Sequence, residues 1–97
     1  MEQRIRMILS PSDLERINFI DATHLTVDVH GFSPKHMKYF LKNIAAIIRG
    51  PFEMTVIHGY NHGTALLETI RKEKIFYRAY ETCLDEVNKG ITYVTFA

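Results

Sequence analysis

The sequence lacks the features that mark secreted, membrane or disulfide-rich proteins. It has one cysteine, Cys83, in 97 residues, so no disulfide can form within the chain, which fits a reducing cytosol. No run of about 18 apolar residues occurs, as a membrane-spanning helix would require. Glu2, Arg4 and Asp13 interrupt the region where the apolar centre of a signal peptide would lie. We therefore expect a cytoplasmic protein with no membrane association.

An excess of charge of one sign is also missing. Twelve Lys and Arg stand against eleven Asp and Glu, which leaves a net charge of +1. Bulk charge therefore gives no reason to expect nucleic acid, and any such partner must be argued from a local site. Low-complexity segments and linkers are absent too. The apolar share of 46% is enough for the hydrophobic core of one domain.

The first 22 residues have the weakest pattern. Ile5, Met7 and Leu9 alternate with other residues, which predicts a short strand. Ser12 and Glu15 have the spacing of a capping box, which predicts a helix from Asp13 to about residue 20. We treat residues 1–22 as an N-terminal extension and residues 23–97 as the main domain.

The middle of the chain alternates strands and helices more clearly. Leu25, Val27 and Val29 share one face of a predicted strand that ends at Gly31. Ser33 and Pro34 are typical of the first positions of a helix. The helical spacing of the following apolar residues continues until residues 50–51, where Gly and Pro end it.

The remaining segments complete an α/β fold. The run FEMTVI (52–57) predicts a buried strand, residues 64–72 a second helix, and residues 74–80 and 91–96 two further strands. A strand–helix–strand unit has a right-handed crossover in nearly all proteins, so the first two strands should be parallel neighbours. The sequence therefore predicts a two-layer βαβαββ sandwich with a four-stranded mixed sheet, preceded by the short extension.

The two parallel strands end in the same dipeptide, His30-Gly31 and His58-Gly59. Parallel strands bring both dipeptides to the carboxyl edge of the sheet, where α/β folds place their ligands. Asp28 lies about 7 Å before His30 on the same strand face, where its carboxylate could orient an imidazole. We interpret Asp28, His30 and His58 as candidate catalytic residues.

A loop rich in glycine follows the second dipeptide and runs into a helix. Glycines allow a close backbone approach, and a helix N-terminus offers unpaired N–H donors to an anion. Tyr60 could stack on a base, and Lys35 and Lys38 should lie near the same edge. The candidate phosphate-binding residues are Gly31, Lys35, Lys38, Gly59, Tyr60, Asn61, His62, Gly63 and Thr64. A zinc site is not expected, because the histidines lack a closed four-ligand set.

These motifs resemble a known family. The segment VDVHG (27–31) resembles the L-D-x-H-G motif of the Smr (small MutS-related) domain, and IHGYNHG (57–63) resembles its H-G-x-G-x-G motif. The segment GITYV (90–94) is similar to the closing strand of that family. The resemblance covers about residues 24–97. Asn61 departs from it by replacing the middle glycine of the second motif.

The resemblance implies a fold similar to the C-terminal domain of translation initiation factor three. It also implies nucleic-acid binding, with nicking or endonuclease activity on DNA or RNA in several members. Carried over by position, Asp28 and His30 match the D and H of the first motif. His58, Gly59 and Gly63 match the H and the outer glycines of the second.

Three interpretations of function follow. The first is a phosphodiesterase in which His30 and His58 share acid and base roles, while Asp28 orients an imidazole or holds a divalent cation, magnesium or manganese. The second is a non-catalytic module that binds RNA, branched nucleic acid or the ribosome, or associates with a repair complex. The third is a site for a small phosphorylated metabolite.

Overall fold

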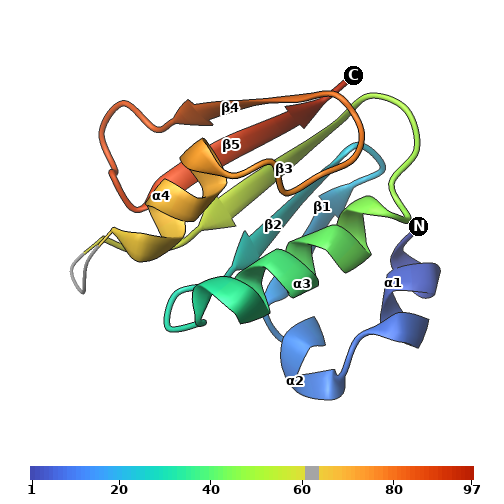
Figure 1. The fold of residues 1–97 in the computed structure, drawn as a ribbon. Helices are drawn as coiled ribbons and strands as arrows, with labels where there is room; N and C mark the ends of the chain where they lie inside the picture. The colour runs from blue at the N-terminus through green and yellow to red at the C-terminus, as the bar shows by residue number, and fades with distance from the viewer. Residues whose placement is uncertain (61–63) are drawn as a thin grey trace.

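A computed structural model describes residues 1–60 and 64–97, which form a mixed β-sheet with helices against one face (Figure 1). The strand order is β1-β2-β3-β5-β4. Along the chain, the described elements are α1 (Glu2–Ile8), α2 (Pro11–Leu14), β1 (Ile17–Asp21), β2 (His24–Asp28), α3 (Pro34–Ala45), β3 (Phe52–Ile57), α4 (Ala65–Lys72), β4 (Tyr80–Leu84) and β5 (Ile91–Phe96). None of these helices has the length and apolar character needed to cross a membrane.

The centre of the sheet agrees with the prediction. β2 and β3 are parallel neighbours, in a register that places Asp28 opposite Ile57. β5 pairs antiparallel with both β3 and β4. The α/β class and the mixed sheet are therefore confirmed, but the sheet has five strands rather than the predicted four. The additional strand is β1, which pairs antiparallel with β2.

The extension was predicted wrongly at its first element, which is the helix α1 and not a strand. Ile5 and Leu9 lie four residues apart, so a helix brings both to one side, where both are buried. Met7 is exposed, although an alternating strand would place it on the same face as Ile5 and Leu9. The short sequence fits the period of a strand and the period of a helix equally well, and burial against α3 decides in favour of the helix.

The second element of the extension also differs from the prediction. Ser10, not Ser12, caps α2, because its hydroxyl accepts a hydrogen bond from the backbone N–H of Asp13 over 3.2 Å. The helix ends at Leu14, and β1 begins where the prediction continues the helix. β1 forms because pairing with β2 satisfies its backbone groups while Phe19 packs against the core.

The fourth strand lies later in the chain than predicted. The segment 74–79 forms no strand, and β4 begins at Tyr80. Within that segment Ile75 and Phe76 are buried, and the ring of Phe76 packs edge-on against Tyr80 and Phe96. The apolar residues that suggested a strand therefore cover the end of the core, while the mainly polar β4 forms the edge of the sheet.

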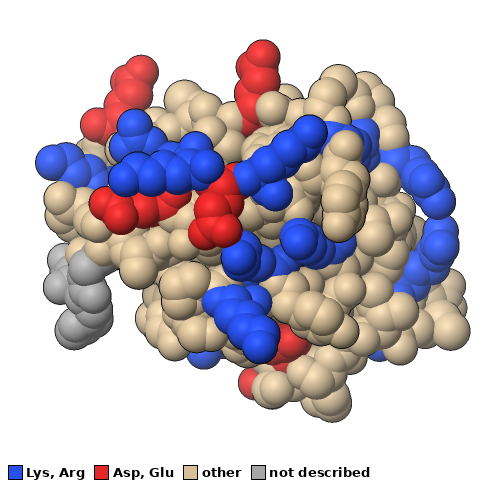
Figure 2. All heavy atoms as spheres, viewed as in Figure 1, with Lys and Arg blue, Asp and Glu red and all other residues tan. Residues whose placement is uncertain are grey.

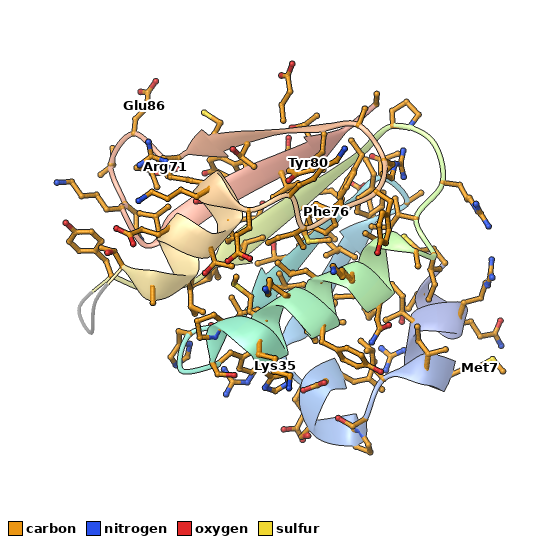
Figure 3. The ribbon with its side chains drawn as sticks, viewed as in Figure 1. Met7, Lys35, Arg71, Phe76, Tyr80 and Glu86 are labelled. Carbon is orange, nitrogen blue, oxygen red and sulfur yellow. The ribbon has the colours of Figure 1, made fainter. Side chains whose placement is uncertain are left out.

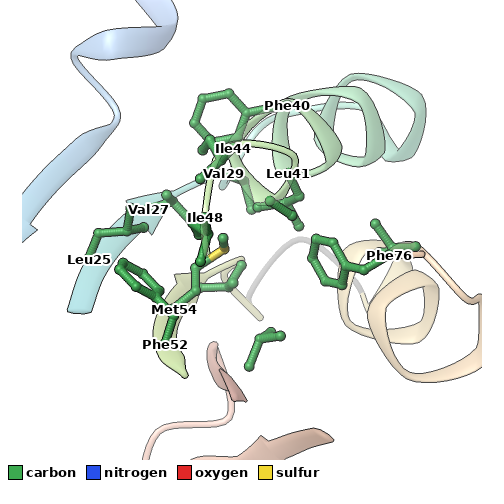
Figure 4. Close-up of a cluster of buried hydrophobic side chains, with 14 of the residues drawn as sticks. Leu25, Val27, Val29, Phe40, Leu41, Ile44, Ile48, Phe52, Met54 and Phe76 are labelled. Atoms are coloured by element: carbon green, nitrogen blue, oxygen red, sulfur yellow. The ribbon is translucent and has the colours of Figure 1, made fainter. Parts of the chain in front are cut away.

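The core lies between the sheet and α3 (Figure 4). α3 begins as predicted, because the Ser33 hydroxyl accepts a hydrogen bond from the His36 N–H over 3.1 Å and Pro34 occupies the first turn. One side of α3 is buried against the alternate, inward-facing residues of β2 and β3. These buried residues are Met37, Phe40, Leu41 and Ile44 on α3, Leu25 and Val27 on β2, and Met54 and Val56 on β3.

Candidate functional site

The two His-Gly corners meet at the carboxyl ends of β2 and β3, as predicted. A Cβ placed on Gly59 would lie 3.4 Å from the Cβ of His30, so the corners are in contact. A hollow of about 540 Å³ opens beside them, and its lining includes His30, Gly31, His58, Gly59 and Tyr60. We call it the rim hollow. Topology alone thus brings together five residues that the sequence singled out.

Asp28 and His30 form a carboxylate–imidazole pair, of which His30 lines the rim hollow. The Asp28 Oδ1 atom accepts a hydrogen bond from His30 Nδ1 and another, of 3.2 Å, from the His30 backbone N–H. With its proton on Nδ1, the imidazole carries a lone pair on Nε2. No residue in the described part of the chain bonds to that Nε2. The geometry therefore suits His30 to act as a base and Asp28 to orient it.

Arg16, from the N-terminal extension, supports this pair. Its Nη1 donates to the backbone carbonyl oxygens of His30 over 3.2 Å and of Asp28 over 3.4 Å. Its guanidinium lies 5.0 Å from the centre of the Phe32 ring, which lines the hollow. The extension thus fixes the turn that carries His30.

His58 has a different environment from His30. It is only 4% exposed, and both of its ring nitrogens are occupied. Nδ1 donates to the Gly59 carbonyl over 2.9 Å, and Nε2 accepts from the Thr92 hydroxyl over 2.8 Å. Burial lowers the pKa of His58 below its ordinary value, although the bond to Gly59 partly opposes this effect. A neutral imidazole held at both nitrogens favours a positioning role over acid–base chemistry.

The loop between β4 and β5 holds the second His-Gly corner, His58-Gly59, through backbone hydrogen bonds. The Gly90 carbonyl accepts hydrogen bonds from the N–H groups of His58 and Gly59, over 2.9 and 3.1 Å. The Gly90 N–H in turn donates to the Asn88 side chain over 2.9 Å. Gly90 and Thr92, two residues of the GITYV segment, are therefore the groups that hold the His58 corner in place.

The N-terminus of α4 opens towards the rim hollow. Ala65 and Leu66, in the first turn of α4, line it. Thr64 occupies the N-cap position, but its side chain makes no capping hydrogen bond. The start of α4, with its first N–H groups and partial positive charge, thus borders the same space as His30. An anion in the hollow would meet both.

The other predicted phosphate-binding residues have mixed positions. Tyr60 lines the hollow, and the Lys89 amine lies 5.7 Å from the centre of its ring. Lys35 and Lys38 do not line it; they border a second hollow along α3. The predictions for Asn61, His62 and Gly63 lie outside the described residues.

A divalent cation would find one carboxylate at this site. Among residues 1–60 and 64–97, no three His, Cys, Asp or Glu side chains form a group that could hold a metal ion. Mg²⁺ is often bound by one or two carboxylates together with substrate phosphates and waters. Asp28 fits that role through the carboxylate oxygen that does not bind His30.

Sequence reasoning missed Arg16 and gave no role to Gly90 or Thr92. Arg16 precedes β1 in a segment that was expected to be helical, so no pattern could connect it to His30. The sequence marks Gly90 and Thr92 only as members of the GITYV segment. The hydrogen bonds to the His58 corner now give both residues a physical reason to occupy those positions.

Comparisons of the chain with protein-family models, curated proteins and solved structures found no match. The Smr-like assignment therefore stays a prediction that depends on the motifs of this sequence and on the geometry of the rim hollow.

Burial of His58 leads to a prediction about pH. Because its pKa is below the ordinary 6.5 in the folded state, the unfolded chain binds more protons between the two values, and stability falls as pH decreases. We expect the melting temperature to drop as pH is lowered from about 6.5 towards the pKa of His58 in the folded protein, and His58→Gln to remove this contribution. An identical pH profile for the wild type and the variant would contradict the assignment.

The contact between Gly90 and Gly59 leads to a second prediction. A Cβ on Gly90 would lie 3.2 Å from the Gly59 Cα atom, where backbone has to move. We expect Gly90→Ala to lower the free energy of unfolding by about 1–3 kcal/mol in urea denaturation. It should also shift the amide NMR signals of His58 and Gly59. Gly50→Ala, whose added Cβ meets no atom within 4 Å, should leave those signals unchanged, and unshifted signals in Gly90→Ala would contradict the contact.

Proposed function

We propose that the protein is an Smr-like phosphodiesterase that nicks DNA or RNA in the rim hollow. The observation that carries this proposal is the Asp28–His30 pair, whose imidazole lines the same hollow as the first turn of α4. A base and an anion-binding helix end are the two parts that phosphodiester cleavage needs from a protein. The two sequence motifs that resemble the Smr domain provide these parts.

The chemistry uses one imidazole in two steps. His30 Nε2 takes a proton from the attacking oxygen, which belongs to water or, in RNA, to a 2′-hydroxyl. The new P–O bond forms as the bond to the leaving oxygen breaks, and the imidazolium returns the proton to that oxygen. Asp28 stabilises the imidazolium, while the N–H groups at the start of α4 stabilise the negative charge on the phosphate.

The remaining residues hold these groups in position. His58 fixes the second corner through its bonds to Gly59 and Thr92, and Arg16 fixes the turn of His30. A divalent cation on Asp28 would neutralise phosphate charge when bound.

Nicking of supercoiled plasmid and cleavage of end-labelled structured RNA test the proposal. Each substrate is incubated with the wild type in EDTA, in magnesium and in manganese, beside His30→Ala purified in the same way. We expect cleavage of at least one substrate by the wild type only. Equal rates for both proteins on every substrate would reveal a contaminating nuclease and overturn the proposal.

The burial of His58 favours a second candidate, a non-catalytic binding module for RNA, branched nucleic acid or the ribosome. With both His58 nitrogens occupied, the rim hollow offers one imidazole where the first interpretation required two. This candidate expects salt-sensitive binding of nucleic acid with no cleavage in any metal. Cleavage that depends on His30 would exclude it.

A further inference from the structure

The small net charge conceals a strong separation of charge along the chain. Residues 34–78 carry eight Lys and Arg and three Asp and Glu, whereas the rest of the chain carries four and eight. The first of these segments contains α3 and α4, which cover one face of the sheet. Figure 2 shows the basic side chains gathered on this helical face, where they outnumber the acidic ones. A basic surface of this kind is the electrostatic signature of nucleic-acid binding.

The outer side of α3 concentrates this charge in a stripe. Lys35, Lys38, Tyr39 and Lys42 are spaced i, i+3, i+4 and i+7, so they share one face of the helix. Tyr39 is 69% exposed. Lys35 lies at the N-terminal end of α3 (Figure 3), beside the turn that carries His30. The stripe thus begins next to the rim hollow.

The surface is grooved along this stripe. A hollow of about 480 Å³ is bordered by Lys35, Lys38, Tyr39 and Lys42, and a second, of about 410 Å³, continues from Lys42 to Tyr77. The second hollow has a mainly apolar floor that includes Phe76. We call the two hollows together the α3 groove. Its Lys, Arg and exposed aromatic residues are Lys35, Lys38, Tyr39, Lys42, Arg49, Tyr77 and Arg78.

Tyr77 lies at the end of the α3 groove farthest from Lys35 and is exposed to solvent. It is 94% exposed, and the Lys42 amine lies 5.7 Å from the centre of its ring. An exposed tyrosine beside a lysine does nothing for the stability of the core. It offers a flat face for stacking, with a cation next to it for a phosphate.

Most of the cations in the groove are not neutralised by carboxylates. Lys38 pairs with Glu73 over 3.0 Å, but Lys35, Lys42 and Arg49 take part in no ion pair among residues 1–60 and 64–97. Arg78 also lines the groove, but its guanidinium binds backbone carbonyl oxygens and so has a structural role. Three cations thus remain open to an external polyanion.

We propose that the α3 groove binds single-stranded nucleic acid, with phosphates on Lys35, Lys42 and Arg49 and bases on Tyr39 and Tyr77. A duplex keeps its bases stacked on each other, so it cannot use the tyrosines. α3 is about 18 Å long at 1.5 Å per residue, which gives the strand a path of several contacts. This proposal rests on the proposed function in one respect: the groove begins at Lys35, next in the chain to Pro34, which lines the rim hollow with His30, so single strands are the substrate class.

Binding to fluorescein-labelled oligonucleotides in EDTA, followed by anisotropy, tests the charge component. We expect the wild type to bind a single strand more tightly than a hairpin duplex of the same length. A Lys35→Gln, Lys42→Gln, Arg49→Gln triple variant should reduce the slope of log affinity against log salt by about 2, because three phosphate contacts are lost. Arg4→Gln, an exposed change on α1, is the matched control for a single basic residue and should leave the slope unchanged.

The tyrosines should contribute base stacking, a part of the binding energy that charge alone cannot supply. Tyr77→Ala should weaken binding of the single strand by about 10-fold and leave binding of an abasic strand of equal length nearly unchanged. Val87→Ala, an exposed apolar change in the β4–β5 loop, should affect neither. Equal losses on both strands, or equal affinity of the wild type for polyglutamate, would overturn the proposal in favour of a general polyanion or an acidic protein partner.

Failure of this inference can be told from failure of the proposed function. His30→Ala should bind the single strand as the wild type does, because His30 lies outside the α3 groove. Binding that depends on the groove in a protein that cleaves nothing would support this inference and remove the proposed catalysis. Cleavage of duplex and single strands at equal rates, with triple-variant binding unchanged, would overturn this inference alone.

Discussion

Replacing His30 by alanine is expected to lower the rate of phosphodiester cleavage by about 10²–10⁴-fold, the usual contribution of a positioned general base. The expectation follows from the bond between His30 Nδ1 and Asp28 Oδ1, which directs the Nε2 lone pair outward. Single-turnover cleavage of the substrate that the wild type prefers gives the rate. Affinity for that substrate should change little, because the imidazole is not one of the proposed phosphate contacts.

Two companion variants sharpen this result. His24→Ala removes the imidazole at the start of β2, at the other end of this strand from the turn that carries His30. This imidazole is hydrogen-bonded to Thr55, and the variant should keep the wild-type rate. Asp28→Asn retains the His30 imidazole but removes the charge beside it, so we expect a smaller loss than for His30→Ala. A His30→Ala protein with the His24→Ala rate would place the chemistry elsewhere.

Replacing Ile5 by alanine is expected to destabilise the protein by about 2–5 kcal/mol, the usual cost of truncating a fully buried Ile. Ile5 has no exposed surface, although it lies in the N-terminal extension. Its side chain belongs to the same core cluster as the residues of β2 and α3. Urea denaturation followed by circular dichroism gives the free energy of unfolding.

The neighbouring Ile8 is the matched control. It lies in the same helix but is 54% exposed, so Ile8→Ala makes the same chemical change with little loss of buried contact. We expect a change within about 0.5 kcal/mol. Similar small effects of both substitutions would show that α1 contributes nothing to the core and that residues 1–22 are an appendage.

The elements that the sequence predicted well are those in which several local signals agree. α3 has an N-cap, a first-turn proline and an apolar stripe of helical period, and all three match its observed start and buried side. β3 has the bounds expected of the run FEMTVI. Here composition, period and turn residues all favour one structure, which is why local reasoning was enough.

The predicted secondary structure of residues 1–22 was wrong because the local sequence signals in this segment conflict. Ile5 and Leu9 fit an alternating strand and a helix equally, and only packing against α3 decides between them. A capping-box spacing at Ser12 and Glu15 obscured β1, whose pairing with β2 depends on residues far along the chain. Strand pairing of this kind is a tertiary effect that no local window contains.

The sequence predicted which segments meet at the candidate site, but not the environment of each side chain. Parallel neighbours with matching ends were enough to place the two His-Gly corners together, and the contact between Gly59 and His30 bears this out. The sequence could not show that the two histidines differ. His58 is buried because Thr92 approaches it from β5, while His30 stays exposed on a turn held by Arg16.

The separation of charge between residues 34–78 and the rest of the chain gives a nearly neutral molecule one strongly basic face (Figure 2). Such a particle is turned by the field of a polyanion before contact, so that its positive side arrives first. Encounters with nucleic acid are then more often productive than random collisions, and this gain in association rate disappears when salt shortens the range of the field. A protein with almost no net charge can in this way approach its target with the orientation of a strongly basic one.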